Sequence, residues 1–471
     1  MTPRTKESKD PLRLVRSGVF ALNRKKWSKA RRKFEAALND EEMQQNSGVW
    51  ANYGIALTKL KLPSDALKAF SIAVRLDKKN ARIWVKKGIT ESQLEQYSEA
   101  AKSFEQASRL DKKDPEIPIL LSRTLRRQNA NKNAIKVLES AQKKFPESHQ
   151  IAIELAIVWN DLKEDQKAEQ VLRKAIHTTN HPDPGLLLAQ TLLDKKDYNQ
   201  AILVYEEILS RFPKSQYAQY GLGISYHANA EWKKAYDAYQ RAVQLFHPEK
   251  PPQSLFVNLG RVLKNLKREK EAIEALYQAK KHGKPTLEIA LLLTELFLEL
   301  DRPARAKQTL EDAIRLDKYN PIIPFYLGLT LLQLKDISGA KENFKRSIEL
   351  DPKFYESKLQ LALLAVQERD FKTAYKLAND VATADPSHVP GSRLAAKLAF
   401  DLRDFKRTID LLEPIVIKDP TNRLEELELL LNSWLLLSQP EKAKIFMHKL
   451  LEEHKNLRSQ LRSRSFFSQF L

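Results

Sequence analysis

The sequence predicts an all-helical chain of about thirteen stacked helical hairpins. Glycine is scarce, with 12 residues in 471. This favours helices, because glycine destabilises their interior whereas sheet folds need it at many tight turns. A small residue, usually alanine, also returns every 33 to 37 residues along nearly the whole chain. With 42% hydrophobic and 30% charged residues, the chain is apolar enough to fold and has a very polar surface.

The repeated small residue defines the phase of the units. It occurs at Ala30, Ala66, Ala100, Ala134, Ala168, Ala201, Ala235, Ala272, Ala306, Ala340, Ala374, Thr408 and Ala443. Four residues later most units have a large apolar side chain, as at Phe34, Phe70, Phe104, Leu138, Tyr205, Tyr239, Phe344 and Met447. Such a period indicates a repeat architecture, in which each unit buries its apolar face against its neighbours.

Each unit is expected to hold two amphipathic helices. Glycine, alanine or serine often lies twelve residues before the repeated alanine, as in Gly54 and Gly88. Small residues at both positions would let the two helix backbones cross closely, and the large apolar residue would fill the space beside the crossing. Several units end in Leu-Asp or Asp-Pro, for example Asp351-Pro352, and proline there cannot continue the second helix.

The pattern resembles the tetratricopeptide repeat family, whose motif is W-x2-L-G-x2-Y, then A-x3-F-x2-A, then P. The second unit matches at Trp50, Tyr53, Gly54, Ala66, Phe70 and Ala73, and the third at Trp84, Gly88, Ala100, Phe104 and Ala107. The resemblance covers residues 11–457. It implies a right-handed superhelical solenoid with a concave groove, lined by the first helices, that binds peptides, extended segments or whole proteins. Residues 1–10 would be a basic N-terminal extension, and residues 458–471 a basic and aromatic tail or a capping helix.

Two units depart from the family pattern. Ala378 stands where the eleventh unit would have its large apolar residue, and Thr408 replaces the alanine of the twelfth. We expect their hairpins to pack less regularly.

The sequence lacks the motifs of catalysis and cofactor binding. It contains no cysteine, no phosphate-binding glycine loop and no G-x-S-x-G motif. His177 and His181 are four residues apart, but the intervening residues lack the glutamate of a zinc motif, and Pro182 places the pair across a helix end. We therefore expect a non-enzymatic protein with no cofactor and no metal site.

The first residues do not read as a signal peptide, and no run of about 18 apolar residues occurs. A soluble, cytoplasmic protein is the expectation.

Groove residues are estimated from the lining positions that the repeat implies. They are Arg82, Lys86, Arg123, Arg126, Arg127, Tyr217, Tyr220, His227, Asn258, Arg261, Lys264 and Asn265. The first five would form a basic patch for an acidic segment of a partner, because arginine binds carboxylates with two hydrogen bonds. The tyrosines and asparagines would contact a partner's backbone. Equally, these charges could belong to a solvated helix face, where substitution barely changes stability. Acidic residues line the same positions in units five and nine, at Glu154, Asp161, Glu288, Glu295 and Glu299.

The net charge of +20 is concentrated at the ends of the chain. Residues 1–40 hold twelve basic and four acidic residues, and the last seventeen residues hold four basic and none acidic. Such ends could bind nucleic acid or an anionic membrane surface, or they could be soluble caps of the array. Leu457, Leu461, Phe467 and Leu471 recur near helical spacing, which suits a short closing helix.

The leading prediction is an adaptor or scaffold that binds a protein partner. The alternative is an RNA- or DNA-associated factor, or a membrane-surface assembly factor, that uses the basic termini. No unit pairs lysine at its fifth position with asparagine at its ninth, the pair by which some family members clamp the C-terminal carboxylate of heat-shock chaperones, so that role is not expected.

Overall fold

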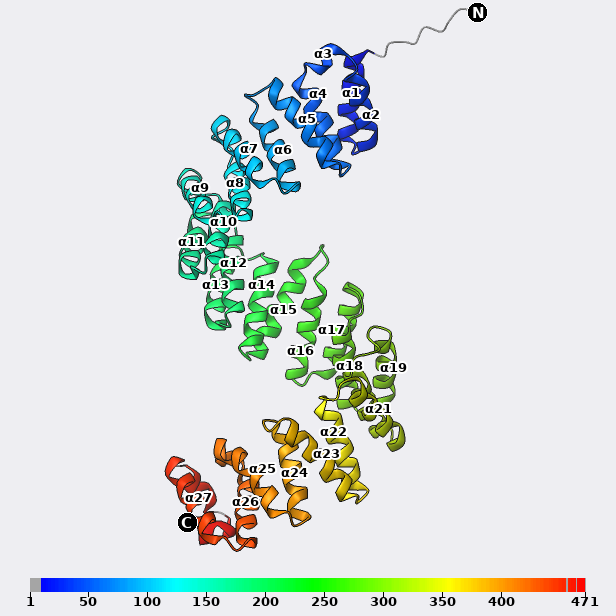
Figure 1. Cartoon of the computed structure of the whole chain (residues 1–471), viewed down its shortest axis with the longest axis vertical. Helices are drawn as coiled ribbons and strands as arrows, with labels where there is room; N and C mark the ends of the chain where they lie inside the picture. Colours follow the sequence, from blue (N-terminus) through cyan, green and yellow to red (C-terminus); the bar gives the residue numbers. More distant parts are fainter. Residues whose placement is uncertain (1–9, 455, 463, 471) are drawn as a thin grey trace, which may run out of the picture. The chain divides into compact units, whose positions relative to one another are not determined.

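A computed structural model describes residues 10–454, 456–462 and 464–470, and within these residues every regular element is a helix (Figure 1). The described chain divides into two compact units, the first ending at Glu249 and the second beginning at Lys250. The predicted all-helical repeat fold is confirmed. Except for Asp10, the predicted N-terminal extension lies outside the described residues, and so does Leu471.

In the first unit, consecutive helices pair as hairpins of a first helix (A) and a second helix (B), with the short α3 (Glu41–Gln44) between two pairs. The pairs are α1 (Pro11–Asn23) with α2 (Trp27–Ala37), α4 (Ser47–Lys59) with α5 (Pro63–Leu76), α6 (Ala81–Gln93) with α7 (Tyr97–Leu110), α8 (Glu116–Arg127) with α9 (Asn131–Lys144), α10 (His149–Asp161) with α11 (Asp165–Thr178), α12 (Asp183–Asp194) with α13 (Tyr198–Arg211), and α14 (Gln216–Ala228) with α15 (Trp232–Phe246).

The second unit continues the same pairing. Its pairs are α16 (Gln253–Asn265) with α17 (Glu269–His282), α18 (Leu287–Glu299) with α19 (Pro303–Ile314), α20 (Ile322–Gln333) with α21 (Ile337–Leu350), α22 (Tyr355–Gln367) with α23 (Phe371–Ala384), α24 (Val389–Asp401) with α25 (Phe405–Lys418), and α26 (Leu424–Leu436) with α27 (Pro440–Glu453). A 3₁₀ turn, η1 (Pro420–Asn422), precedes α26, and α28 (Leu457–Leu461) and η2 (Ser465–Gln469) close the described chain. The right-handed superhelix and the number of family repeats stay predictions.

The core of each hairpin lies where its two helices cross. Every residue of the predicted small-residue series, from Ala30 to Ala443, is at most 2% exposed, so the phase taken from the sequence is correct. The large residue four positions later is buried as well. This large side chain accounts for the glycine found in helix A of several repeats. A Cβ added at Gly54, for example, would lie 2.8 Å from the ring of Phe70. The glycine is therefore needed to make room for the aromatic ring.

The two departures from the repeat pattern are also fully buried. Ala378 replaces an aromatic residue, and the position opposite is Ala362 instead of glycine; both are 0% exposed. Thr408 is 0% exposed, and its hydroxyl lies 3.0 Å from the carbonyl oxygen of Asp404, which accepts its hydrogen bond. The threonine thus satisfies its polar atom within its own helix.

The turn between helices A and B has one geometry throughout. After α4, Lys61 takes φ 61°, the N–H of Leu62 donates to the carbonyl of Leu57 at 3.0 Å, and the N–H of Lys61 donates to Thr58. This is the Schellman arrangement that ends a helix. The residues with positive φ are Lys25, Lys61, Glu95, Asn129, Lys163, Lys196, Ala230, Lys267, Asp301, Lys335, Arg369, Arg403 and Ser438. Glycine usually fills this position, but no described glycine has positive φ. The low glycine content therefore also reflects these turns.

The C-terminal residues pack onto the last hairpin. Leu457, Leu461 and Phe467 are each 0% exposed and belong to the same apolar cluster as Trp434 and Met447. Their burial supports the capping interpretation of the tail, which a deletion or substitution must test.

We expect Ala100→Leu to lower the free energy of unfolding by about 1–3 kcal/mol. Ala100 is 0% exposed at the crossing of α6 and α7, so the larger side chain must push the helices apart. Glu105→Leu, on the exposed side of the same helix, is the matched control. Guanidinium titration of both variants measures the effect, and equal midpoints for the two would contradict the packing described here.

Candidate binding face

The A helices of neighbouring hairpins contact one another in both units. In the first unit α6 contacts α8, α8 contacts α10, and α10 contacts α12; in the second, α16 contacts α18 and α24 contacts α26. We call the surface formed by these helices the A face. Side chains on one A helix can therefore reach those on the next, which is the arrangement expected for a binding surface built from successive repeats.

The predicted basic patch is partly neutralised by acidic groups of the next repeat. On α8, Nε of Arg123 donates to Oε1 of Glu154 on α10 at 2.7 Å. Arg126 lies 3.6 Å from the other oxygen of Glu154 and 2.8 Å from Asp161. Glu154 is only 4% exposed, so these two arginines compensate a buried carboxylate. This removes the basis for the expectation that a substitution at Arg123 would barely change stability.

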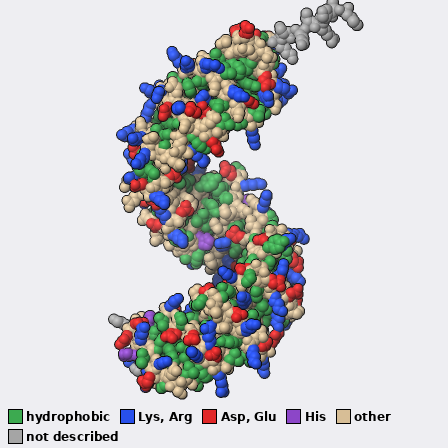
Figure 2. All heavy atoms as spheres, viewed as in Figure 1, with side chains coloured by type: hydrophobic (Ala, Val, Ile, Leu, Met, Phe, Trp, Pro, Cys, Tyr) green, Lys and Arg blue, Asp and Glu red, His purple; other side chains and the backbone are tan. Residues whose placement is uncertain are grey.

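Three predicted cations remain exposed on the A face. Arg82 and Lys86 lie one turn apart on α6, and Arg127 lies at the end of α8. Within the described part of the chain the structure gives them no ion pair. Figure 2 shows basic and acidic side chains interspersed over the visible face of the first unit. The cations available to a ligand are thus fewer than the five predicted.

The same pairing between A helices recurs in the second unit. Arg261 on α16 lies 2.6 Å from Glu288 on α18. Lys264 lies 2.5 Å from Glu295 and 3.3 Å from Glu299. Partial burial acts to lower the pKa of Lys264, but the hydrogen bond and charge of Glu295 outweigh it and raise that pKa. The acidic positions of units five and nine are thus partners of the basic positions in units four and eight.

A further ion pair joins successive A helices in the same way: Arg393 on α24 pairs with the buried Glu426 on α26. This pair was not predicted, although a basic and an acidic residue at lining positions of adjacent units indicate such a contact.

The predicted tyrosine stretch is partly engaged within its own hairpin. Tyr217 is 57% exposed and its ring lies edge-on to Phe246, with 5.4 Å between the centroids. The ring of Tyr220 packs against Tyr239. The ring centroids of His227 and Trp232 are 5.5 Å apart. Trp232, Tyr239 and Phe246 all belong to α15. Tyr217 therefore keeps the largest part of its surface available to a partner.

Of the remaining predicted residues, Asn265 is exposed at the end of α16 and Asn258 is half-buried.

Cavities lie on the other side of the array, between successive B helices. One, about 580 Å³, is bounded by α13, α14 and α15 and includes Glu206, Gln219, Tyr226 and Arg241. A second, about 530 Å³, occupies the equivalent place between α7, α8 and α9. Burial and the hydrogen bond to Glu206, 2.6 Å long, raise the pKa of Tyr226. The lining positions predicted from the sequence belong to the A face alone, so these cavities were not predicted.

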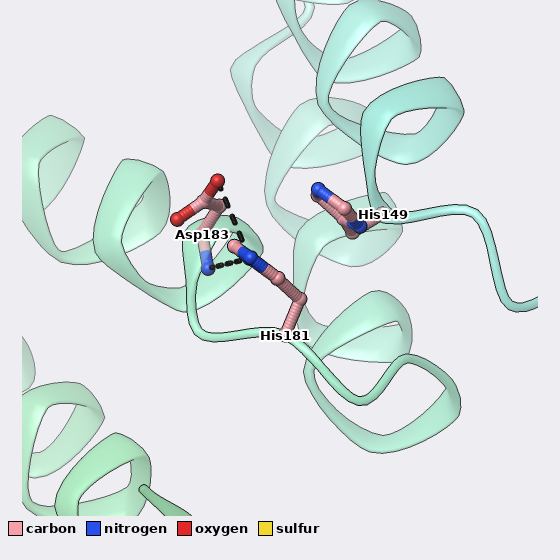
Figure 3. A group of neighbouring side chains, drawn as sticks. All are labelled: His149, His181 and Asp183. Carbon is pink, nitrogen blue, oxygen red and sulfur yellow. Dashed lines mark hydrogen bonds and ion pairs between the residues drawn. The ribbon is translucent and has the colours of Figure 1, made fainter. Parts of the chain in front are cut away.

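A cluster of three side chains that could bind a metal ion lies where two neighbouring repeats begin. His149 is the first residue of α10, Asp183 is the first of α12, and His181 lies in the loop before α12 (Figure 3). His177, which the sequence places near His181, lies 3.4 Å from Glu207 instead. Burial, and then the charge of His181, lower the pKa of His149. The repeat brings His181 close to a histidine of the preceding repeat, a pairing that the sequence analysis did not consider.

Comparison with known families identifies the repeats. One tetratricopeptide repeat model matches residues 119–184 and 186–254, and a second matches residues 81–114, 254–281 and 326–354. The chain is a tetratricopeptide repeat protein, as the sequence predicts. No curated protein sequence matches it significantly. Within the described residues, no helix combines the length and hydrophobicity that crossing a bilayer requires.

Several solved structures are similar to the chain. Yeast Tom70 is 14% identical, with 96% of this chain and 99% of that chain covered and a TM-score of 0.40. The C-terminal part of a repeat protein from Cytophaga hutchinsonii is 20% identical over 52% of this chain and 99% of that chain, with a TM-score of 0.41. YrrB, described as a TPR protein with an unusual peptide-binding site, is 20% identical over 38% of this chain and 90% of that chain, with a TM-score of 0.35. These likenesses carry no partner over to this chain.

Proposed function

We propose that the chain is a non-enzymatic, cytoplasmic adaptor that binds an acidic segment of a partner protein on the A face of α6 and α8. Tetratricopeptide repeats act in general as scaffolds for protein–protein interaction. The observation that carries the finer proposal is a set of exposed cations on two A helices in contact, for which no described residue provides an ion pair: Arg82, Lys86 and Arg127.

The arrangement favours a short, extended and acidic ligand. Arg82 and Lys86 are four residues apart and so lie on one side of α6, while Arg127 extends the positive surface onto α8. Arg123, one turn before Arg127, is oriented by Glu154 and leaves 57% of its side chain exposed. Carboxylates spaced along one segment could therefore bind the guanidinium groups in succession.

We expect the double variant Arg82→Glu with Arg127→Glu to weaken binding of a labelled, glutamate-rich peptide of twelve residues by at least about tenfold. Attraction is replaced by like-charge repulsion at two places. The matched control is Arg75→Glu with Lys136→Glu, which changes the net charge equally at exposed positions on the B helices α5 and α9. Fluorescence anisotropy gives both affinities. An equal loss in the two variants would mean that only the overall charge matters, and the A face would be rejected as the site.

The same assay tests the alternative of nucleic-acid binding. A complex with six or more phosphate contacts should lose roughly a thousandfold in affinity between 50 and 200 mM salt. A single-stranded RNA of the same length that binds with this slope, and more tightly than the peptide, would favour the RNA-associated function. Binding to anionic vesicles that the A-face variant leaves unchanged would favour the membrane-surface function.

A further inference from the structure

We propose that His149, His181 and Asp183 form a zinc site that ties the start of α10 to the start of α12. The site lies apart from the A-face cations and does not depend on the proposed function. It replaces the expectation of no metal site, which considered His181 only together with His177, a pair that lacks the motif glutamate and lies across a helix end.

The repeat itself brings the three groups together. His149 and His181 are 32 residues apart, close to one period, so each lies where a B helix of one hairpin leads into the A helix of the next. Ser148 caps α10 and accepts a hydrogen bond from the amide of Ile151, which fixes the backbone beside His149. Pro182 restricts the chain between His181 and Asp183. The three side chains therefore extend from defined backbone positions.

The three ligand atoms are close together, although the two rings are not oriented for an ion. One ligand atom from each residue lies within 4.8 Å of the other two. The imidazole rings of His149 and His181 are stacked, with centroids 4.0 Å apart and planes inclined by 8°. A tetrahedral zinc ion holds its ligand atoms about 2.1 Å from itself, hence roughly 3.4 Å from one another. The nitrogen lone pairs of the two stacked rings lie in nearly parallel planes, so at least one ring must turn about its Cβ–Cγ bond before both nitrogens can point at one ion. All three residues are partly exposed, so an ion can reach them.

The environment of one nitrogen points to a cation. Nδ1 of His181 accepts a hydrogen bond from the Asp183 amide at 3.4 Å and lies 3.3 Å from Oδ2 of Asp183 (Figure 3). An Nδ1 that accepts a hydrogen bond carries a lone pair, and a lone pair repels the adjacent carboxylate oxygen. A positive charge shared by the two atoms removes this repulsion. A metal ion bound by both atoms would supply this charge, and the amide hydrogen bond to Nδ1 would then be given up.

Zinc fits this donor set best. Two imidazoles and one carboxylate are a common ligand set for zinc, with a fourth position left to water or to a partner's side chain. Magnesium and calcium prefer ligand sets made of oxygen alone. Bound zinc would join two neighbouring repeats at their edge and stabilise their stacking, since a ligand that binds only the folded state raises its stability.

The test is a titration of the untagged full chain with Zn²⁺ by calorimetry, after treatment with a chelator. We expect one site per chain, and at least about tenfold weaker binding in His149→Ala and in His181→Ala. His177→Ala, which removes an exposed histidine outside the cluster, is the matched control and should bind as the parent does. The proposal also predicts that Zn²⁺ raises the melting temperature of the parent but not of the His149→Ala variant.

Three outcomes would overturn the proposal. One is the absence of saturable binding in the parent. The second is binding that neither His149→Ala nor His181→Ala weakens. The third is an equal loss in His177→Ala, which would indicate non-specific binding to surface histidines. Circular dichroism of each variant separates loss of a ligand from loss of the fold. If His149→Ala is misfolded, His149→Gln repeats the test with a larger side chain.

Discussion

Replacing Leu461 and Phe467 together by alanine is expected to lower the stability of the C-terminal repeats by about 5–8 kcal/mol. Both side chains are 0% exposed in the cluster that covers the last hairpin. Single substitutions of buried leucine and phenylalanine by alanine cost about 2–5 and 3–5 kcal/mol. The loss should appear as early unfolding of α26 and α27 in hydrogen exchange, and as aggregation when the apolar surface becomes exposed.

The matched control removes charge and keeps the apolar contacts. Arg458→Ser with Arg462→Ser changes two exposed residues of the same segment, and exposed charges contribute little to stability. If the tail is a cap, the alanine variant is unstable and the serine variant behaves as the parent. If both stay fully stable but either loses binding to an anionic vesicle or an RNA, the tail is a ligand-binding segment and the capping interpretation is wrong.

The double variant Arg123→Met with Arg126→Met is expected to lower the free energy of unfolding by about 3 kcal/mol. It leaves the carboxylate of Glu154, 4% exposed, without a compensating charge. Breaking a buried ion pair costs about 3–5 kcal/mol, and the lower end applies because the side chain of Arg123 is 57% exposed. Methionine keeps most of the volume of the arginine stem, so packing changes little.

A third substitution makes this test specific. Adding Glu154→Leu to the double variant removes the buried charge and should restore most of the lost stability, because apolar groups can replace a buried ion pair at little cost. Arg127→Met, one turn further along α8, removes an exposed cation and should change stability by no more than about 0.5 kcal/mol. If the double variant unfolds at the same denaturant concentration as the parent, the ion pairs from α8 to α10 do not form in solution.

The sequence was sufficient to predict the hairpins and their core. Each repeat buries the same positions, so the series from Ala30 to Ala443 identifies the helix crossings without any knowledge of distant contacts. The division at Glu249 was not predicted, although two signals mark it. The step from Ala235 to Ala272 is the longest between repeats, and the segment 247–252, HPEKPP, separates the two helices there.

The candidate sites were predicted less well, because they depend on which residues of adjacent repeats face one another. The basic and acidic positions were each identified, and the basic ones of units three and four were combined into one patch, but basic positions were not paired with acidic positions of the next unit. The pairing of Arg123 with Glu154 arises only when two A helices are packed side by side. The cluster of His149 and His181 has the same origin, since the two histidines meet only through stacking.

The left-handed residue at each turn between helices A and B has an electrostatic consequence. Eight of these residues are basic: Lys25, Lys61, Lys163 and Lys196 in the first unit, and Lys267, Lys335, Arg369 and Arg403 in the second. Each follows the carbonyl end of an A helix, where a positive charge is favoured. Neighbouring helices pack about 8–10 Å apart, which is close to the distance of about 8 Å over which physiological salt screens a charge. In dilute buffer the basic turns of consecutive repeats, such as Lys335, Arg369 and Arg403, would act on a polyanion as one short line of charge. Such a line ends where Glu95 or Asp301 takes the same position. At physiological ionic strength the same cations would act as separate points, so weak binding of polyanions seen only at low salt would reflect the turns of the fold.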